Sequence, residues 1–253
     1  MKPGNDSLNF DKLLAPIMLL RSGKHWALDL FKRCGWLVKR RAVRRRAGAW
    51  RRSSIVAADC QILEQRVLLS TITVTSLADS LNAGNGVTLR DAIQAANTDA
   101  SVDGSAAGQA GVQNVIVFQP GLSGTISLDS ALGQMTISSS VDIQGLGAAN
   151  TIIDAHHNSR IFQITSGAGA VTLDSLTIEN GKSSATGIYN GGIYNGGGAI
   201  QDQSRETLTI LNSIVTGNST LGYAADGGAI LKFGPLAVTN STFSGNSTGG
   251  DYA

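Results

Sequence analysis

The sequence predicts an all-β fold in which short strands coil into a parallel solenoid, closed at its N-terminal end by one short helix. Two observations support this prediction. Residues 197–219 and 227–247 both begin with Gly-Gly-Ala-Ile and both end with Gly-Asn-Ser, and their starting points lie thirty residues apart. Ahead of them, apolar clusters of three to five residues alternate with Gly, Asn, Ser or Asp. Repeats of this length, poor in helix formers, are typical of stacked solenoids.

Charge divides the chain into two unlike parts. Residues 1–70 contain 15 Lys and Arg against 5 Asp and Glu, whereas residues 71–253 contain 5 against 13. Both cysteines, Cys34 and Cys60, lie in the basic part, so no disulfide can stabilise the acidic part. The shortage of Lys and Arg argues against nucleic acid as its partner. Sugars, proteins or cations are the partners that we expect instead.

Residues 1–70 are expected to form a basic leader that lies largely outside the core. The apolar run at 13–20 is far shorter than the about 20 residues that a membrane-spanning helix needs. An arginine-rich run follows at 39–46. Such a run fits a nucleic-acid tail, a contact with an anionic membrane, the start of an export signal, or a solvated tail.

The end of this leader carries a short motif. Residues 63–69, Leu-Glu-Gln-Arg-Val-Leu-Leu, resemble the LEPR-XLL segment near the N-terminus of large exported bacterial surface proteins, with Gln65 in the place of its proline. The resemblance implies that the protein is secreted or lies at the cell surface or outer membrane of a bacterium. It also implies that the leader contacts the membrane or the export machinery.

Residues 71–112 are expected to form an N-terminal cap of strand, helix and loop. Residues 71–75 alternate as a strand does. Thr88 is placed to begin a helix that ends near Asn97, with Asp91 as its capping-box partner. The apolar residues of this helix share one face and would cover the end of a solenoid. The stretch also resembles the CSLREA domain, which precedes β-helical repeats in secreted and surface proteins, through Leu89, Arg90, Ala92, Ile93, Ala95, Ala96 and Asn97.

Residues 113–253 are expected to supply the repeats. Strands this short are stabilised by pairing with the turns above and below them, at about 4.8 Å. Gly197 and Gly227 are expected to adopt positive φ at tight corners. Asn218 should stack on Asn246, and Asn212 on Asn240, with their side-chain amides bonded along the stack. The clusters expected as strands are 115–118, 125–128, 135–137, 141–143, 151–153, 161–164, 171–173 and 176–178.

The two clean copies also carry a family resemblance. Gly-Gly-Ala-Ile followed by Phe-x-x-Asn, complete at 243–246 and with Val215 in the place of Phe in the earlier copy, resembles the repeats of polymorphic outer-membrane proteins. The same pattern occurs in right-handed parallel β-helix repeat proteins. The resemblance implies a right-handed, pectin-lyase-like solenoid. Residues 249–253 stand where a further turn would begin, so we expect a fragment of a longer surface protein.

The implied fold does not choose a function, because enzymes and binding proteins share it. We expect adhesion, or binding of carbohydrate or protein, without catalysis. The alternative is a polysaccharide lyase or glycoside hydrolase. A likeness to pectate lyases would require clustered aspartates that bind calcium and an arginine as base, for which Asp174, Asp202, Asp226 and Arg205 are the candidates. Their lyase motifs are absent, and the three aspartates are interpreted as carboxylates on solvent-facing loops.

Two further patterns are interpreted as having no catalytic role. Residues 97–99, Asn-Thr-Asp, match one polygalacturonase motif, but the other motifs of that family are missing. His156 and His157 follow Asp154, yet adjacent histidines on a strand or turn point to opposite sides and no third ligand is evident. A solvated turn is expected there. No cofactor is expected, calcium is the only cation considered, and the sequence does not predict an oligomeric state.

Overall fold

The computed structural model divides into two units, residues 1–62 and 63–253. It describes residues 70–185, 196–222 and 226–249, which all belong to the second unit. The predicted leader and its motif thus lie outside the described residues. Within the described ranges, no helix is both long enough and apolar enough to span a membrane.

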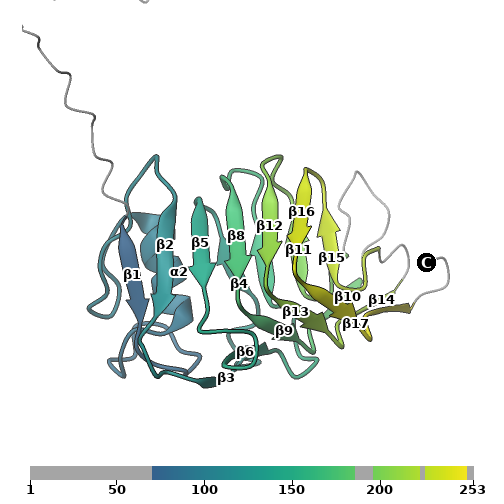
Figure 1. Ribbon diagram of the computed structural model, residues 1–253, viewed down its shortest axis with the longest axis horizontal. Coiled ribbons are helices and arrows are strands. Elements are labelled where there is room, and N and C mark those ends of the chain that lie inside the picture. Colours follow the sequence, from purple (N-terminus) through teal and green to yellow (C-terminus); the bar gives the residue numbers. More distant parts are fainter. Residues whose placement is uncertain (1–69, 186–195, 223–225, 250–253) are drawn as a thin grey trace, which may run out of the picture. The chain divides into compact units, whose positions relative to one another are not determined.

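The described residues form a solenoid-like stack of parallel strands with one short helix, as expected (Figure 1). Four parallel sheets, here called A to D, run along the stack. Sheet A has the order β1 (Thr71–Val74), β2 (Asn114–Phe118), β5 (Val141–Gln144), β8 (Val171–Asp174), β12 (Leu208–Leu211) and β16 (Leu236–Thr239). Sheet B contains β3 (Gly124–Ser127), β6 (Thr151–Asp154), β9 (Thr177–Glu179), β13 (Ile214–Thr216) and β17 (Thr242–Ser244).

Sheets C and D complete the coil. Sheet C contains β4 (Met135–Ile137), β7 (Phe162–Ile164), β11 (Ile200–Asp202) and β15 (Ile230–Lys232). Sheet D contains β10 (Lys182–Ala185), β14 (Ser219–Gly222) and β18 (Ser247–Gly249). The chain visits sheets A, B and C in turn, with sheet D inserted between B and C in the later coils. Each of the eight predicted clusters coincides with a strand, which confirms their placement.

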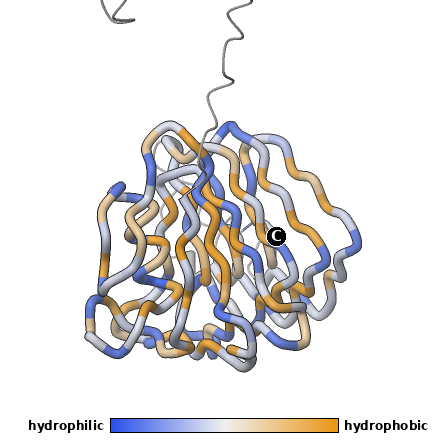
Figure 2. Tube along the Cα trace, turned by 60° about the vertical axis from the view of Figure 1, so that its left-hand side comes forward, coloured by the Kyte–Doolittle hydropathy of each residue, from blue (hydrophilic) through white to orange (hydrophobic). Residues whose placement is uncertain are grey.

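The strand register places the inward side chains of successive coils directly on one another. In sheet A, Ile116 pairs with Ile143, Ile143 with Leu173, and Leu173 with Ile210, and all four side chains are fully buried. Figure 2 shows apolar stretches of neighbouring coils lying side by side. Each short strand therefore buries its apolar residues only through the coil above and the coil below.

The corners of the coil are formed by residues in the left-handed region. Gly197 and Gly227 have φ of 76° and 66° at the start of sheet C, as predicted. Asn212 and Asn240 have φ of 47° and 50° at the corner between sheets A and B. Asn tolerates this conformation better than most side chains do, because its amide can bond locally. The amide of Asn240 lies 3.4 Å from the Oδ1 atom of Asn212, so the expected stacking is present.

A second asparagine ladder, formed by the buried Asn218 and the partly buried Asn246, lies between sheets B and D. The Nδ2 atom of Asn218 donates to Asn246 Oδ1 at 2.9 Å and to the Ile178 carbonyl at 3.2 Å. Its Oδ1 atom accepts from the backbone N–H of Gly181 at 2.7 Å. The side chain is fully buried, so these bonds satisfy polar groups that water does not reach. This predicted ladder is also confirmed.

Helix α2 (Leu89–Thr98) closes the N-terminal end of the stack, where it packs on β1, β2 and β4 (Figure 1). Thr88 is its N-cap, and Asp91 completes a capping box. Its apolar face buries Leu89, Ala92 and Ile93. The predicted capping helix is confirmed, with its end one residue later than expected.

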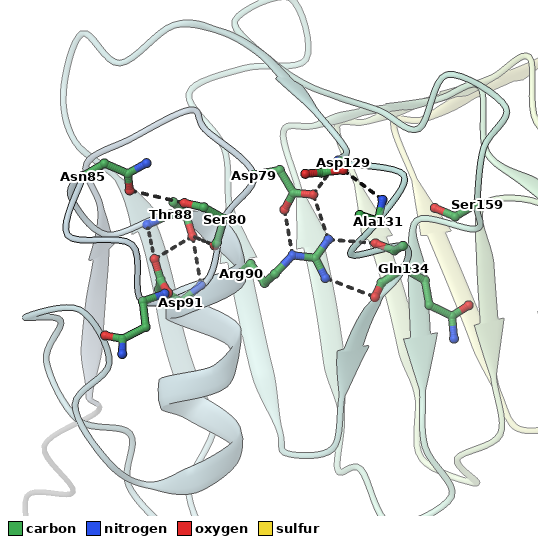
Figure 3. A network of polar contacts seen from close by, with 12 residues as sticks. Asp79, Ser80, Asn85, Thr88, Arg90, Asp91, Asp129, Ala131, Gln134 and Ser159 are labelled. Atoms are coloured by element: carbon green, nitrogen blue, oxygen red, sulfur yellow. Dashed lines mark hydrogen bonds and ion pairs between the residues drawn. The ribbon is translucent and has the colours of Figure 1, made fainter.

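Arg90 fastens this helix to the first coil (Figure 3). Its guanidinium forms two bonds with the carboxylate of Asp79, at 2.7 and 2.8 Å. The same group donates to the carbonyls of Gly133 at 2.7 Å and Gln134 at 3.2 Å. Bidentate pairing fixes both distance and orientation. Arg90 therefore acts in the attachment of the cap.

Candidate functional site

The four candidate catalytic residues lie at separate places in the stack. Asp174 ends β8, at the corner between sheets A and B. Asp202 ends β11 in sheet C, whereas Asp226 precedes β15, at the opposite end of that sheet's strands. Arg205 lies in the loop between β11 and β12. The structure does not gather the three aspartates around one ion or one base.

Asp202 is a buried partner in an ion pair. Its Oδ2 atom lies 2.9 Å from Lys232 Nζ, with only 1% and 5% of the two side chains exposed. Its Oδ1 atom accepts from the Ser204 N–H at 2.7 Å. Lys232 also donates to the carbonyls of Ser204 and Glu206, at 2.9 and 2.7 Å. The interpretation of Asp202 as a solvent-facing carboxylate is thus wrong.

The repeat itself carries a signal for this pair. Asp202 and Lys232 lie thirty residues apart, which equals the distance between Gly197 and Gly227. The repeat therefore places Lys232 directly beside Asp202 in the next coil, and the strand register agrees. A charge buried in this way is retained because its counter-ion lies beside it and its Oδ1 atom accepts a hydrogen bond from Ser204.

The other two aspartates also have roles in the stack. Asp174 Oδ1 accepts from Ser175 Oγ at 2.8 Å and from Asn212 Nδ2 at 2.9 Å, so it extends the Asn212 ladder by one coil. The backbone carbonyl of Asp226 accepts from the Gly197 N–H at 3.0 Å, while the residue itself is exposed. Asp174 is thus held by side-chain bonds and Asp226 by a backbone bond, and both kinds of bond link successive coils.

The histidine pair forms a turn, as predicted. The backbone N–H of His156 and its Nδ1 atom approach the Asp154 carboxylate at 2.8 and 3.2 Å, while His157 donates its N–H to the Asn180 carbonyl. Burial and the nearby Asp154 charge raise the pKa of Glu179, and His156 opposes this shift. In the described ranges, no three acidic, histidine or cysteine side chains are arranged to hold a metal ion.

A hollow with both polar and apolar lining lies along the loops that connect sheet C to sheet A. One part, of about 460 Å³, is bounded by the end of α2, residues 109–114 and the loop at 139–140. A second part, of about 480 Å³, is bounded by residues 166–170 and 203–206. Gly167 and Gly169 line both parts. We call the two parts together the edge groove.

Hydrogen bonds hold the walls of the edge groove in place. The side chain of Asn97 donates to the Thr136 carbonyl and accepts from the Ser138 N–H, both at 2.8 Å. Ser140 Oγ donates to the Ala170 carbonyl at 2.8 Å. These bonds cross from one coil to the next, so the groove exists before any ligand binds.

Two glycines keep the edge groove open, in different ways. A Cβ atom on Gly169 would lie 2.8 Å from the Cβ of Ser140, so this position cannot take a side chain without displacing the preceding coil. A Cβ atom on Gly167 would meet no atom within 4 Å, so the space above it belongs to the groove. From the sequence, such residues are expected only as spacers between strands.

Amide- and hydroxyl-bearing residues supply most of the polar lining of the edge groove, beside small apolar residues and the exposed Asp99 at the end of α2. Gln109, Gln113 and Gln203 contribute side-chain amides, and serines stand between them. Arg205 and Glu206, both exposed, lie at the end farthest from α2. Arg205 is thus the one predicted candidate residue that lines this groove. Neutral groups that both donate and accept suit ligands rich in hydroxyls.

No protein-family model, no curated protein and no solved structure matches this chain. Its family resemblances rest on the short motifs of the leader, the cap and the two clean repeats.

Proposed function

We propose that this chain is an exported, non-catalytic protein of the bacterial surface, which binds an extended polysaccharide along the edge groove. Its solenoid is a right-handed, pectin-lyase-like β-helix in this proposal, as the Gly-Gly-Ala-Ile repeats suggest. The observation that supports binding most directly is the edge groove, with its amide and hydroxyl lining and its glycine floor.

The direction of the edge groove favours a polymer over a small molecule. Its walls come from loops of successive coils, which repeat at about 4.8 Å along the stack. A chain of sugar rings can therefore present similar hydroxyls to one loop after another. Asn97 and Ser140 use their polar atoms to hold the walls, while the exposed Arg205 and Glu206 face solvent at one end.

Binding without catalysis is favoured by the positions of the candidate acids. A lyase or glycosidase of this fold would need carboxylates gathered where a substrate lies. Asp202 is buried beside Lys232, and Asp174 is bonded to Asn212 in an asparagine ladder. Asp226 lies just before β15, at the opposite end of the sheet C strands from Asp202. The second candidate ligand is a surface protein, which would bind in the same groove.

A groove-filling variant tests the proposal. Gly167→Tyr adds a ring between the two parts of the edge groove, where a new Cβ meets no neighbour within 4 Å, so the fold should persist. We expect affinity electrophoresis in gels that contain bacterial or plant polysaccharides to retard the parent chain. We expect Gly167→Tyr to lose at least tenfold in affinity, which corresponds to about 1.4 kcal/mol.

The matched control is Thr125→Tyr, which adds the same ring at an exposed position of sheet B. It should bind as the parent does. Equal binding by both variants would contradict the groove as the site, and cleavage of any tested polysaccharide would contradict a non-catalytic role. Retention of the chain in the cytoplasm after cell fractionation would contradict export.

A further inference from the structure

The charged side chains that line the edge groove are few and mainly acidic. Asp99 lies at the α2 end of the groove, and Arg205 and Glu206 lie at the other end. All three residues are exposed, and the remaining lining residues are uncharged. The lining therefore offers two carboxylates against one guanidinium.

The end of helix α2 adds negative charge to the first part of the groove. The last residues of a helix carry a partial negative charge, which a lysine or arginine in the final turn can balance. The final turn of α2 has no basic residue, and the C-cap is Asp99 itself. Ala96 and Asn97, near this end of the helix, line the groove. An anionic ligand would thus be repelled at the α2 end.

The other basic residues of 71–253 do not offset this charge. Arg90 and Lys232 are largely buried in ion pairs with aspartates. Arg160 donates to backbone carbonyls just ahead of β11, at the opposite end of the sheet C strands from the groove. Lys182 belongs to β10 in sheet D. Of these five cations, only Arg205 lines the groove, and an acidic residue follows it.

We propose that the edge groove selects an uncharged polysaccharide and rejects polymers whose sugar rings carry carboxylates or sulfates. This inference rests on the proposed function and names the class of ligand. A polyuronate carries a carboxylate on each ring, so several anions would enter the groove together and lose water beside Asp99 and Glu206, with one arginine to pair with them. An uncharged polymer brings hydroxyls alone, and amides and hydroxyls of the lining can bond to these.

Matched polymers test this proposal with the full chain. Galactomannan, galactan and a soluble glucan are each compared, by affinity electrophoresis, with a derivative whose primary hydroxyls are oxidised to carboxylates. Residues 1–70 are strongly basic and could bind polyanions by themselves. Groove-dependent binding is therefore taken as the part that Gly167→Tyr removes. We expect the groove-dependent affinity for each oxidised polymer to be at least tenfold lower than for its parent.

A variant that removes one charge tests the cause of this selectivity. Asp99 has φ of 53°, a left-handed conformation that asparagine also tolerates, so Asp99→Asn should keep the helix end while it removes the carboxylate. The ratio of neutral to oxidised affinity should narrow by about threefold at low salt. Asp226→Asn is the matched control, because it removes an exposed carboxylate at the other end of the sheet C strands. It should leave the ratio unchanged.

The possible outcomes separate this inference from the function on which it rests. Groove-dependent binding of the oxidised polymers that equals or exceeds binding of their parents overturns the inference but leaves the proposed function standing. A ratio that Asp99→Asn leaves unchanged, or that Asp226→Asn narrows equally, also overturns it. If no polymer of either kind shows groove-dependent binding, the proposed function is itself contradicted and the inference fails with it.

Discussion

The two ends of the solenoid have strands of the same kind but differ in how their inward side chains are covered. At the N-terminal end, Ile72 and Val74 of β1 are fully buried, because α2 packs on this rung. At the other end, Leu236 and Val238 of β16 remain about half exposed. A rung therefore gains stability from what lies on both of its sides, and its own sequence supplies only half of that contact.

The difference also concerns polar groups. The capped end joins helix, loop and first coil through Arg90 and Asp79, whose side chains are 11% and 2% exposed. No comparable ion pair holds the last rung, where β16 to β18 lack charged residues. Substitutions at the two ends should consequently have very different effects on the free energy of unfolding.

The largest effect is expected at the fastening of α2. Arg90→Ala leaves the buried Asp79 carboxylate without its counter-ion, and breaking a buried pair in this way costs about 3–5 kcal/mol. Urea unfolding followed by circular dichroism measures the loss. Arg205→Ala is the control, since this arginine is exposed and should change stability by less than about 0.5 kcal/mol. Similar losses in both variants would show that α2 is not fastened by this pair.

A somewhat smaller effect is expected from the apolar residues, and here the two ends are compared directly. Leu89→Ala at the capped end removes a side chain that is 1% exposed and should cost about 2–5 kcal/mol. Leu236→Ala, at the open rung, should cost less than about 1 kcal/mol in dilute protein, because much of that side chain already contacts water. Urea unfolding of both variants measures the two costs. A Leu236→Ala cost as large as that of Leu89→Ala would contradict the openness of the last described rung.

Much of the fold could be predicted because its signals are local. The inward residues of each short strand, the glycine corners and the capping box of Thr88 and Asp91 are all legible within a few neighbouring positions. The strands of sheet D were missed. Residues 182–185 and 219–222 are mainly small and polar, and they form strands because neighbouring coils hold them in register.

The candidate site was harder to predict for a related reason. The edge groove arises where loops from different coils meet, and its lining of Gln, Ser and Gly carries no motif of its own. Arg205 was singled out as a possible base, but only the structure shows that it lines a groove while Asp202 is buried beside Lys232. A repeat predicts which residues stack, whereas loop shape depends on contacts between coils.

A smaller effect than that of Arg90→Ala or Leu89→Ala is expected within the ladder of Asn218 and Asn246, where two consecutive rungs carry the same residue. Asn218→Ala removes a buried hydrogen-bond partner from the N–H of Gly181 and from the carbonyl of Ile178, where water cannot replace it. This loss should cost about 1–3 kcal/mol of stability. Asn246 is only partly buried and belongs to the open rung, where water can replace its bonds to Val215 and Asn218. Asn246→Ala should therefore cost less, about 0.5–1.5 kcal/mol.

Hydrogen exchange separates this local effect from global unfolding. The amide of Gly181 should exchange faster in Asn218→Ala than the loss of overall stability explains, because its acceptor is gone. In Asn246→Ala that amide keeps its acceptor and should follow the global stability. Equal exchange rates of the Gly181 amide in both variants, together with equal urea midpoints, would contradict this prediction. The two rungs would then shield the ladder from water equally, and the two ends of the solenoid would differ only in their apolar side chains.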